Sequence, residues 1–246
     1  ESLDLFKHNL LNAKPTIFLG VPRIWSKFQE GILNKMSQKK LNVLLMIPFI
    51  NSIVKKKIKT QLGLSEAVDI FCGAAAMPVA LLKWFKKLGL NIQEAYAMTE
   101  NCCYSHVTLN DNIRIGYVGK PLPHCEVKLS DQKEILIKHK ALMDGYYKDD
   151  VTTNETIKDG WLYTGDQGEI DQDGFLKITG RIKDLFKTSK GKYIVPSSIE
   201  TLLSDDQNID QVCVVGSGLT QPILLVVLNE NAKNKPANEV KGLLGK

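Results

Sequence analysis

The chain has 246 residues, of which 43% are hydrophobic and 24% charged, so it can bury the core of one large domain or of two ordinary ones. Its net charge is +5, from 32 basic and 27 acidic side chains, and the basic residues are dispersed and often lie beside acids. This pattern is typical of a solvated surface and argues against a nucleic-acid partner.

The spacing of cysteine and histidine argues against disulfides and zinc. The cysteines form no C-x-x-C pattern, and the histidines lack the paired spacing of a structural zinc site. These residues are Cys72, Cys102, Cys103, Cys125 and Cys213, and His8, His106, His124 and His139. We therefore expect a reducing, cytoplasmic setting.

The beginning of the chain alternates between helical and extended patterns. The apolar residues from Leu3 to Leu11 have the spacing of an amphipathic helix, and Thr16 to Gly20 is typical of a short buried strand. Pro22 suits the first turn of the next helix.

A strongly apolar run from Leu41 to Ile50 is followed by a cluster of lysines. The cluster consists of Lys55, Lys56, Lys57 and Lys59. About ten apolar residues, interrupted by Pro48, are too few to span a bilayer. We favour a core or capping helix with a solvated end, and a helix that lies on a membrane surface is the alternative.

Two further apolar runs, Val68 to Cys72 and Ile92 to Tyr96, predict strands on either side of a helix that Pro78 opens. This order predicts parallel strands with a site beyond their carboxyl ends. Small residues after the first strand would let a planar ligand approach the backbone, although ordinary strand-to-helix packing explains them equally well. These small residues are Gly73, Ala74, Ala75 and Ala76. The second strand is followed directly by Met98, Thr99 and Glu100.

The stretch from Trp161 to Asp184 places turn-forming residues between short apolar runs. Gly165 followed by Asp166 predicts a tight turn at a strand end, which would project the Asp166 carboxylate from a braced position. A second turn over Asp171–Gly174 leads into a strand that ends at Arg181. A β-hairpin with solvated charges is the alternative to a ligand site.

Beyond Asp184, the segment LFKTSKGKYIVPSSIE contains a Gly-Lys pair but lacks the G-x-x-x-x-G-K-[ST] spacing of a P-loop. Two β-rich runs follow, Val212 to Val215 and Ile223 to Leu228. They predict the core of a small α+β domain.

Four motifs in this order resemble the adenylate-forming superfamily of acyl-CoA synthetases, luciferases and peptide-synthetase adenylation domains. They are A-Y-A-M-T-E at Ala95–Glu100, Y-T-G-D at Tyr163–Asp166, D-x-D-G-F at Asp171–Phe175 and G-R-x-K-D at Gly180–Asp184. The run PTIFLGVPRIWSKF is similar to a segment of long-chain acyl-CoA synthetases in particular.

The resemblance implies a nucleotide site and a magnesium ligand. It assigns Tyr96 to adenine stacking, Thr99 to the phosphates and Glu100 to Mg²⁺, and the side chains suit these roles. It assigns Asp166 to the ribose hydroxyls and Arg181 to the ribose and phosphate. It also places Gly73, Ala74 and Ala75 beside the adenine. The chain departs from the family at Ala97, where Gly is usual.

The resemblance also implies a mobile C-terminal domain. It places the hinge at Lys183, and it assigns Lys187 and Lys192 to catalytic positions that face the adenylate or pantetheine as the domain rotates. Solvated lysines are the alternative for both. At Lys190 the chain departs again, because long-chain members usually have Gly there, near the expected thiol path.

The fold that the resemblance implies is α/β. Residues 1–181 would form the C-terminal portion of the large AMP-binding domain, with a parallel sheet, helices and a distorted β-barrel. Residues 182–246 would form most of the small mobile α+β domain. The family's Ser/Thr/Gly-rich phosphate loop should precede Glu1 and its acylating lysine should follow Lys246, so we expect the later half of a longer enzyme that is inactive by itself.

The implied function is that of an ATP-dependent fatty acid CoA ligase, acting on long chains, which forms acyl-AMP and then acyl-CoA. The expected cofactors and substrates are ATP, Mg²⁺, coenzyme A and a fatty acid. We expect the enzyme to be cytoplasmic, and association with a membrane is the alternative. An acyl-AMP ligase or an aryl-acid ligase of the same superfamily would share these motifs. A non-catalytic nucleotide-binding or interaction module is the alternative from another class, and the pattern predicts no oligomeric state.

Overall fold

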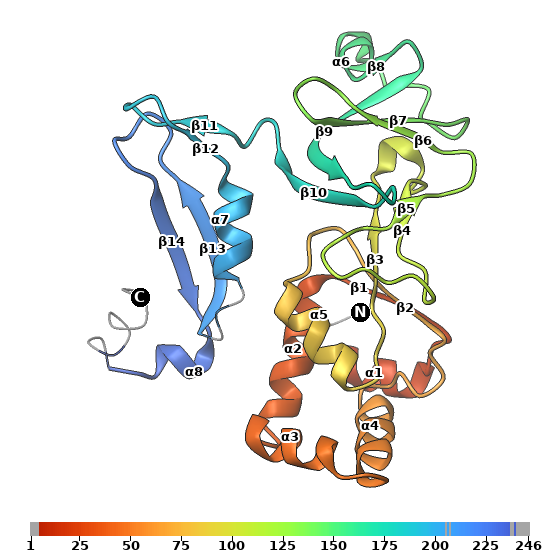
Figure 1. Ribbon diagram of the computed structural model, residues 1–246, viewed down its shortest axis with the longest axis vertical. Helices are drawn as coiled ribbons and strands as arrows, with labels where there is room; N and C mark the ends of the chain where they lie inside the picture. The colour runs from red at the N-terminus through yellow and green to blue at the C-terminus, as the bar shows by residue number, and fades with distance from the viewer. Residues whose placement is uncertain (1–4, 205, 207, 237–238, 240–246) are drawn as a thin grey trace. The chain divides into compact units, whose positions relative to one another are not determined.

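The computed structural model describes residues 5–204, 206, 208–236 and 239 (Figure 1). The chain divides into two compact units, and each is described by itself. Unit 1 consists of Glu1–Glu126, His139–Gly145 and Ile170–Lys177. Unit 2 consists of Val127–Lys138, Tyr146–Glu169 and Ile178–Lys246.

Unit 1 combines helices with a mixed five-stranded sheet of order β1-β2-β3-β4-β5. The strands are β1 (Ile17–Gly20), β2 (Asp69–Cys72), β3 (Gln93–Tyr96), β4 (His106–Val107) and β5 (Lys120–Pro121). The helices are α1 (Phe6–Ala13), α2 (Pro22–Leu33), α3 (Gln38–Met46), α4 (Ile50–Gln61), α5 (Val79–Lys87) and the 3₁₀ turn η1 (Thr99–Asn101). Strands β2 and β3 are parallel, as the sequence predicts, and β1 also pairs parallel with β2. The pairs β3–β4 and β4–β5 are antiparallel.

The core of unit 1 lies between the helices and the parallel strands. Trp25 of α2 and Phe85 of α5 are fully buried, with ring centroids 5.2 Å apart in an edge-to-face arrangement. The Trp25 indole N–H donates to the Gly20 carbonyl oxygen at 3.1 Å, so the polar end of this large side chain is satisfied inside the core. The prediction of a buried first strand is only half right, because Ile17 and Leu19 of β1 are 64% and 67% exposed.

The apolar run from Leu41 to Ile50 is not one helix. It is divided between α3 and α4 by the segment around Pro48, and Figure 1 shows the two helices as a hairpin. Ile47 has extended backbone, with φ −83° and ψ 119°, because a residue before proline disfavours the helical conformation. Phe49 then turns the chain with φ 66°.

Unit 2 contains most of a second sheet of order β10-β9-β7-β6, with β8 paired to β9. The elements are β6 (Glu126–Leu129), β7 (Glu134–Lys138), α6 (Asp150–Thr156), β8 (Ile157–Lys158), β9 (Trp161–Ile170) and β10 (Leu176–Arg181). Ile135, Ile137 and Leu162 are fully buried in it.

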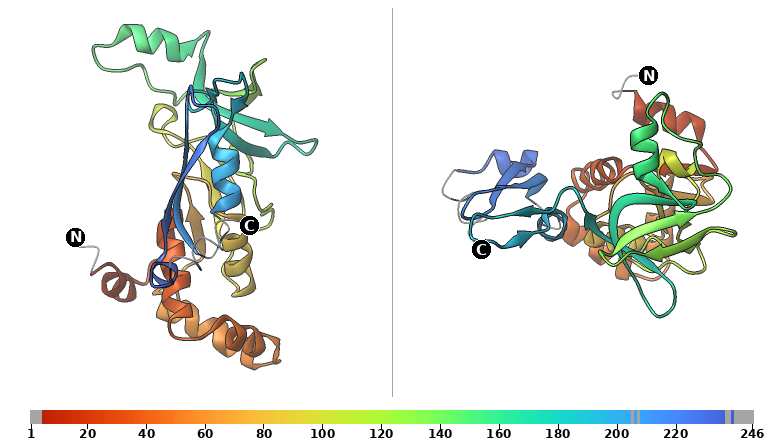
Figure 2. Two further views of the ribbon diagram at one scale, coloured as in Figure 1. Left: turned by 90° about the vertical axis from the view of Figure 1, so that its left-hand side faces the viewer. Right: turned by 90° about the horizontal axis from the view of Figure 1, so that it is seen from above.

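Residues 186–233 form two small hairpins and two helices. The elements are β11 (Phe186–Lys187), β12 (Tyr193–Ile194), α7 (Pro196–Leu203), β13 (Ile209–Val215), β14 (Ile223–Leu228) and α8 (Glu230–Lys233). Strands β13 and β14 pair antiparallel, and α7 packs against β13 (Figure 2). The Glu200 carboxylate of α7 accepts from the Val214 N–H at 2.8 Å, which ties the helix to the hairpin.

Within the described residues, no helix combines the length and the apolar character that crossing a membrane requires.

Candidate functional site

Two predicted site segments lie at the carboxyl ends of neighbouring parallel strands in unit 1. Strands β2 and β3 are parallel neighbours, with Cys72 opposite Glu94, and their carboxyl ends lead into Gly73 and Ala97. A Cβ at Gly73 would lie 3.4 Å from the Ala95 carbonyl oxygen, so this loop passes close to β3. All the predicted ligand-binding residues of unit 1 therefore lie at or just beyond the carboxyl ends of β2 and β3. They are Gly73, Ala74, Ala75, Tyr96, Thr99 and Glu100.

Tyr96 is the last residue of β3, and its half-buried ring lies next to a buried histidine. The ring centroids of Tyr96 and His106 are 6.0 Å apart. Burial lowers the pKa of His106 to about 4, so its imidazole is neutral near pH 7. The Ser105 hydroxyl lies 2.7 Å from Nδ1 of this ring. The tyrosine is therefore supported by a neutral ring, and the sequence contains no pattern that identifies His106 as its neighbour.

The turn that carries Thr99 and Glu100 is held by a fully buried amide. Oδ1 of Asn101 accepts from the Met98 N–H at 3.1 Å. The Glu100 carbonyl oxygen accepts from the Met143 N–H at 2.8 Å. The sequence motifs do not include Asn101, although its position three residues after Met98 is the spacing at which a side chain reaches back to the start of a helical turn.

A second residue that sequence analysis missed is Glu94 of β3, which is 9% exposed. Its Oε2 accepts from the Gly116 N–H at 3.3 Å, and a further backbone hydrogen bond comes from Met77. Burial raises the pKa of Glu94 to about 7, against these hydrogen bonds, which lower it. One carboxyl group thus fixes β3 to the segment that follows the Gly73 loop and to the loop at Gly116.

The donor set near η1 is small. Among the described residues there is no group of three or more His, Cys, Asp and Glu side chains that could hold a metal ion. Glu100 offers a carboxylate at the predicted magnesium position. Mg²⁺ is commonly bound through one or two carboxylates together with substrate phosphates, so a single acidic residue fits this ion.

In unit 2 the predicted pair Asp166 and Arg181 is joined by an ion pair. Arg181 Nε lies 3.0 Å from Asp166 Oδ1, on neighbouring strands β10 and β9. The Asp166 side chain is 7% exposed, whereas that of Arg181 is 68% exposed. A buried carboxylate is therefore combined with a guanidinium that can move into solvent.

The predicted turn at Gly165 and Asp166 is wrong. Both residues lie inside β9, where they form a β-bulge. Leu136 pairs with Tyr163 and Glu134 with Gln167, so β9 has extra residues at this point. Gly165 supplies the positive φ of 73° that the bulge requires. A bulge redirects a side chain without ending the strand, which is how Asp166 is projected.

Two side chains hold the bulge in place. The Gly165 N–H donates to Glu134 Oε1 at 2.8 Å. The Thr164 hydroxyl donates to the Ile135 carbonyl oxygen at 2.8 Å and accepts from the Asp166 N–H at 3.1 Å. The position of Asp166 is thus set by side-chain contacts to strand β7, a dependence that the Y-T-G-D pattern does not reveal.

The three predicted lysines follow β10 and are all exposed. Lys183 comes directly after Ile182, whose N–H donates to the Gly165 carbonyl oxygen at 2.8 Å. Lys187 ends β11, with its ammonium 5.2 Å from the centroid of the Tyr193 ring. The turn between β11 and β12 is closed by Thr188, whose hydroxyl accepts from the Lys192 N–H at 3.1 Å.

The predicted residues thus fall into two groups. Unit 1 contains those assigned to adenine, phosphates and Mg²⁺, and unit 2 contains those assigned to ribose and to the C-terminal domain. Each group is ordered by hydrogen bonds within its own unit.

Comparison with known proteins gives matches along nearly the whole chain. Residues 2–147 match the AMP-binding enzyme family, and residues 183–243 match the AMP-binding enzyme C-terminal domain. Long chain acyl-CoA synthetase 4 of Arabidopsis thaliana is 30% identical over 265 residues, which cover 93% of this chain and 40% of that protein. Long chain acyl-CoA synthetase 6, peroxisomal, of the same plant is 32% identical over 254 residues, which cover 89% of this chain and 36% of that protein.

The solved structure of the anthranilate CoA ligase AuaEII in complex with anthranoyl-AMP is similar in fold. Its TM-score is 0.75 at 22% identity, and the match covers 99% of this chain and 45% of that chain. The likeness confirms the predicted fold class. The chain spans less than half the length of these relatives. Because the family match alone extends over more than half of the residues, this chain belongs to the AMP-binding enzyme family.

Proposed function

We propose that the chain is part of an ATP-dependent fatty acid CoA ligase that acts on long-chain acids. Such an enzyme forms an acyl-adenylate when a carboxylate oxygen attacks the α-phosphorus of ATP and the bond to pyrophosphate breaks. A thiolate of coenzyme A then attacks the acyl carbon, and AMP leaves. The observation that carries the proposal is the buried Asp166 carboxylate on its braced bulge, paired with an exposed arginine.

Asp166 and Arg181 would bind the ribose. Two vicinal hydroxyls can donate to one carboxylate, and Asp166 is held for this by the hydrogen bonds at Gly165 and Thr164. Because the Arg181 side chain is largely exposed, it can leave Oδ1 and bind the ribose or the phosphate as nucleotide enters. The ion pair would therefore hold the carboxylate in one orientation until substrate arrives.

Tyr96 would stack on the adenine, with the small side chains of Ala74 and Ala75 allowing the base to approach the backbone. Ala74 has φ 67°, and both alanines are exposed. The methyl group of Ala97 stands where the family usually has glycine, and Ala97 is half-buried at the end of β3. We infer that this methyl group limits how closely the nucleotide approaches β3.

The η1 turn would bind the phosphates. Thr99 is exposed and offers a hydroxyl to a phosphate oxygen, and Glu100 would hold Mg²⁺. Bound Mg²⁺ supplies neutralisation of phosphate charge. Asn101 keeps the turn in a single conformation, so that the two side chains are positioned before the nucleotide binds.

The C-terminal lysines would serve the later steps. We infer a hinge at Lys183 and a small mobile domain over residues 182–246, with residues 1–181 belonging to the large domain. Lys187 and Lys192, both exposed in the β11–β12 hairpin, would approach the adenylate or the pantetheine as this domain rotates. The exposed Lys190 lies in the same turn and would narrow the thiol path.

The choice of a fatty acid rests on the relatives, since those that match at about 30% identity are long-chain acyl-CoA synthetases. The anthranilate CoA ligase shares the fold, so an aryl acid is the second candidate, and an acyl-AMP ligase is the third. We propose a cytoplasmic enzyme that contacts membranes peripherally.

ATP–pyrophosphate exchange in the complete protein, measured across a panel of carboxylic acids, tests the proposal. We expect exchange that depends on long-chain fatty acids, and thioester release when coenzyme A is added. If only aryl acids support exchange, the substrate is an aryl acid and not a fatty acid. If the protein forms adenylate but no thioester, it is an acyl-AMP ligase. The absence of exchange with every acid, together with nucleotide binding, would favour a non-catalytic nucleotide-binding module.

A further inference from the structure

The charge of the chain is strongly uneven around α3 and α4. Residues 31–65 contain seven lysines and no acidic residue, and the nearest acids are Glu30 and Glu66. The seven are Lys35, Lys39, Lys40, Lys55, Lys56, Lys57 and Lys59. A segment with this composition repels cations and attracts an anionic partner.

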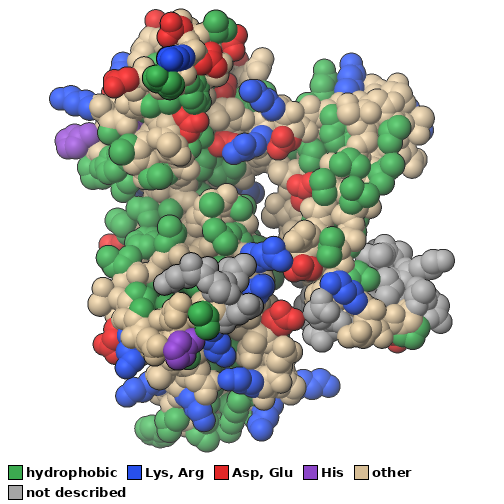
Figure 3. Space-filling view, turned by 180° about the vertical axis from the view of Figure 1, so that it is seen from behind, with side chains coloured by type: hydrophobic (Ala, Val, Ile, Leu, Met, Phe, Trp, Pro, Cys, Tyr) green, Lys and Arg blue, Asp and Glu red, His purple; other side chains and the backbone are tan. Residues whose placement is uncertain are grey.

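The connection between α3 and α4 exposes large apolar side chains. Phe49 is 87% exposed, Met46 80% and Ile53 67%, although hydrophobic residues of this size are usually buried. Val43, Ile47 and Ile50 are also exposed. We call this set, Val43, Met46, Ile47, Phe49, Ile50 and Ile53, the apolar tip. Figure 3 shows hydrophobic side chains gathered at this end of unit 1, with Lys and Arg side chains next to them.

Lysines lie one helical turn behind the apolar tip on both helices. Lys39 precedes Val43 by four residues in α3, and Lys57 follows Ile53 by four residues in α4. Four residues bring two side chains to the same helix face, about 5 to 6 Å apart along the axis. Amphipathic helices at a bilayer surface bury their apolar face by about 5 to 10 Å and keep their lysines at the head groups. The spacing in α3 and α4 matches this depth.

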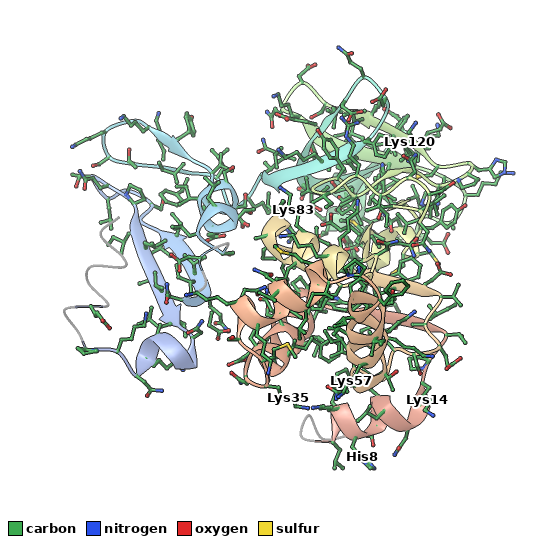
Figure 4. All side chains as sticks on the ribbon, turned by 60° about the horizontal axis from the view of Figure 1, so that its bottom comes forward. His8, Lys14, Lys35, Lys57, Lys83 and Lys120 are labelled. Carbon is green, nitrogen blue, oxygen red and sulfur yellow. The ribbon has the colours of Figure 1, made fainter. Side chains whose placement is uncertain are left out.

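A hollow behind the tip adds to the positive charge. It has a volume of about 520 Å³, lies among α1, α2, α3 and α4, and has an apolar wall that includes Phe28, Ile32 and Leu44. Five lysines line it, and none of its lining residues is acidic. These lysines are Lys7, Lys27, Lys35, Lys40 and Lys57, of which Figure 4 labels Lys35 and Lys57.

We propose that the α3–α4 hairpin docks onto an anionic lipid surface, with the apolar tip inserted among the acyl chains and the lysines on the phosphate and carboxylate head groups. A lipid surface fits better than an acidic protein helix, because side chains as exposed as Phe49 and Met46 project from the hairpin and do not line a groove. This surface gives a location to the peripheral membrane contact proposed above, and it does not depend on the ligase activity.

Co-sedimentation of the complete protein with lipid vesicles tests the proposal. We expect binding to vesicles of phosphatidylcholine with phosphatidylserine, little binding to phosphatidylcholine alone, and release at raised sodium chloride concentration. Each lysine at an anionic bilayer strengthens binding about fivefold, so the double variant Lys56→Gln/Lys57→Gln should bind about 25-fold more weakly. Phe49→Ser should weaken binding about tenfold to a hundredfold.

Matched controls lie elsewhere on the surface. Lys86→Gln/Lys87→Gln removes two adjacent exposed lysines from the end of α5, and Tyr147→Ser removes an aromatic side chain that is 88% exposed. Neither should change the binding. Urea unfolding in vesicle-free solution reports whether each variant is folded, so this control does not rest on the ligase proposal.

Fluorescence supplies a second measurement. In the variant Phe49→Trp we expect a blue shift of the added emission when phosphatidylserine vesicles are present. Equal binding by the hairpin variants and the controls would overturn the proposal. So would an added tryptophan whose emission does not respond to vesicles, since the tip would then be covered by another part of the protein.

Discussion

The buried carboxyl group of Glu94 makes the stability of unit 1 depend on pH. Its pKa is about 7 in the folded chain, against an ordinary value of 4.5, because burial disfavours the charged form. A difference of this size corresponds to about 3 kcal/mol between the two protonation states. The fold thus holds a group that is easily accommodated as the neutral acid and poorly as the anion.

The sign follows from the raised pKa. Below pH 4.5 the carboxyl group is protonated in both the folded and the unfolded chain, and its contribution to stability is fully present. As the pH rises toward 7 the unfolded chain releases the proton first, so the free energy of unfolding falls by about 3 kcal/mol and then levels off.

The variant Glu94→Gln removes this dependence. The amide oxygen of glutamine can still accept from the Gly116 and Met77 N–H groups, and the side chain does not ionise. Urea unfolding of the complete protein at several pH values should show similar stability of the two proteins near pH 4.5, and a variant that is more stable by about 3 kcal/mol above pH 7. The exposed Glu66→Gln is the control.

A constant difference between wild type and Glu94→Gln across this pH range would refute the reasoning, because it would mean that the pKa of Glu94 is the same in the folded and the unfolded chain. A less stable variant above pH 7 would show that the anion is stabilised by its hydrogen bonds more strongly than burial opposes it.

Three further predictions concern unit 2. Asp166→Ala should reduce adenylate formation about tenfold to a hundredfold while the protein stays folded, as ATP–pyrophosphate exchange would measure; unchanged exchange would remove Asp166 from the site. Lys190→Gly should speed thioester formation more than adenylation, and an equal effect on both half-reactions would show that this lysine does not restrict the thiol path. Gly180→Ala should lower the free energy of unfolding by about 1 to 3 kcal/mol, because the new methyl group would lie 2.8 Å from the Ser197 hydroxyl. The double variant Gly180→Ala/Ser197→Ala should recover part of this loss in urea unfolding, and a single variant as stable as wild type would refute the clash.

The helices and strands that carry a strong local signal were predictable from the sequence. Pro22 opens α2 and Pro78 directly precedes α5, and the apolar alternation before Arg181 gives β10. These signals depend on residues within one or two turns of each other, so they are readable in a single stretch of sequence.

The bulge in β9 was not predictable in the same way. Gly-Asp favours a turn when only its own backbone is considered. In the folded chain the strand continues because β7 and β10 pair on either side of β9, and Glu134 accepts the hydrogen bond that the positive φ at Gly165 leaves available. Residue 134 is 31 positions away from residue 165, and no local pattern links them.

The residues of the candidate site likewise differ in whether a local sequence pattern identifies them. The motifs pointed to Tyr96, Thr99, Glu100, Asp166 and Arg181, which carry chemically distinctive side chains, and their roles remain predictions. The residues that position these five were missed. They are Glu94, Asn101, His106 and Glu134, which act on backbone groups or on a neighbouring ring.

The missed residues share a physical logic. The proposed adenylate formation would require donors and acceptors that are in place before charge develops, since reorienting them during the reaction would add to the barrier. A loop cannot supply that order by itself, because its backbone N–H groups lack regular partners. Glu94 and Asn101 accept from the loop N–H groups of Gly116 and Met98, and Glu134 accepts from the Gly165 N–H at the bulge in β9. Each of these hydrogen bonds therefore restrains a backbone segment next to a predicted ligand-binding residue. Mutagenesis of Glu94, Asn101 and Glu134 is for this reason as informative as mutagenesis of the predicted binding residues.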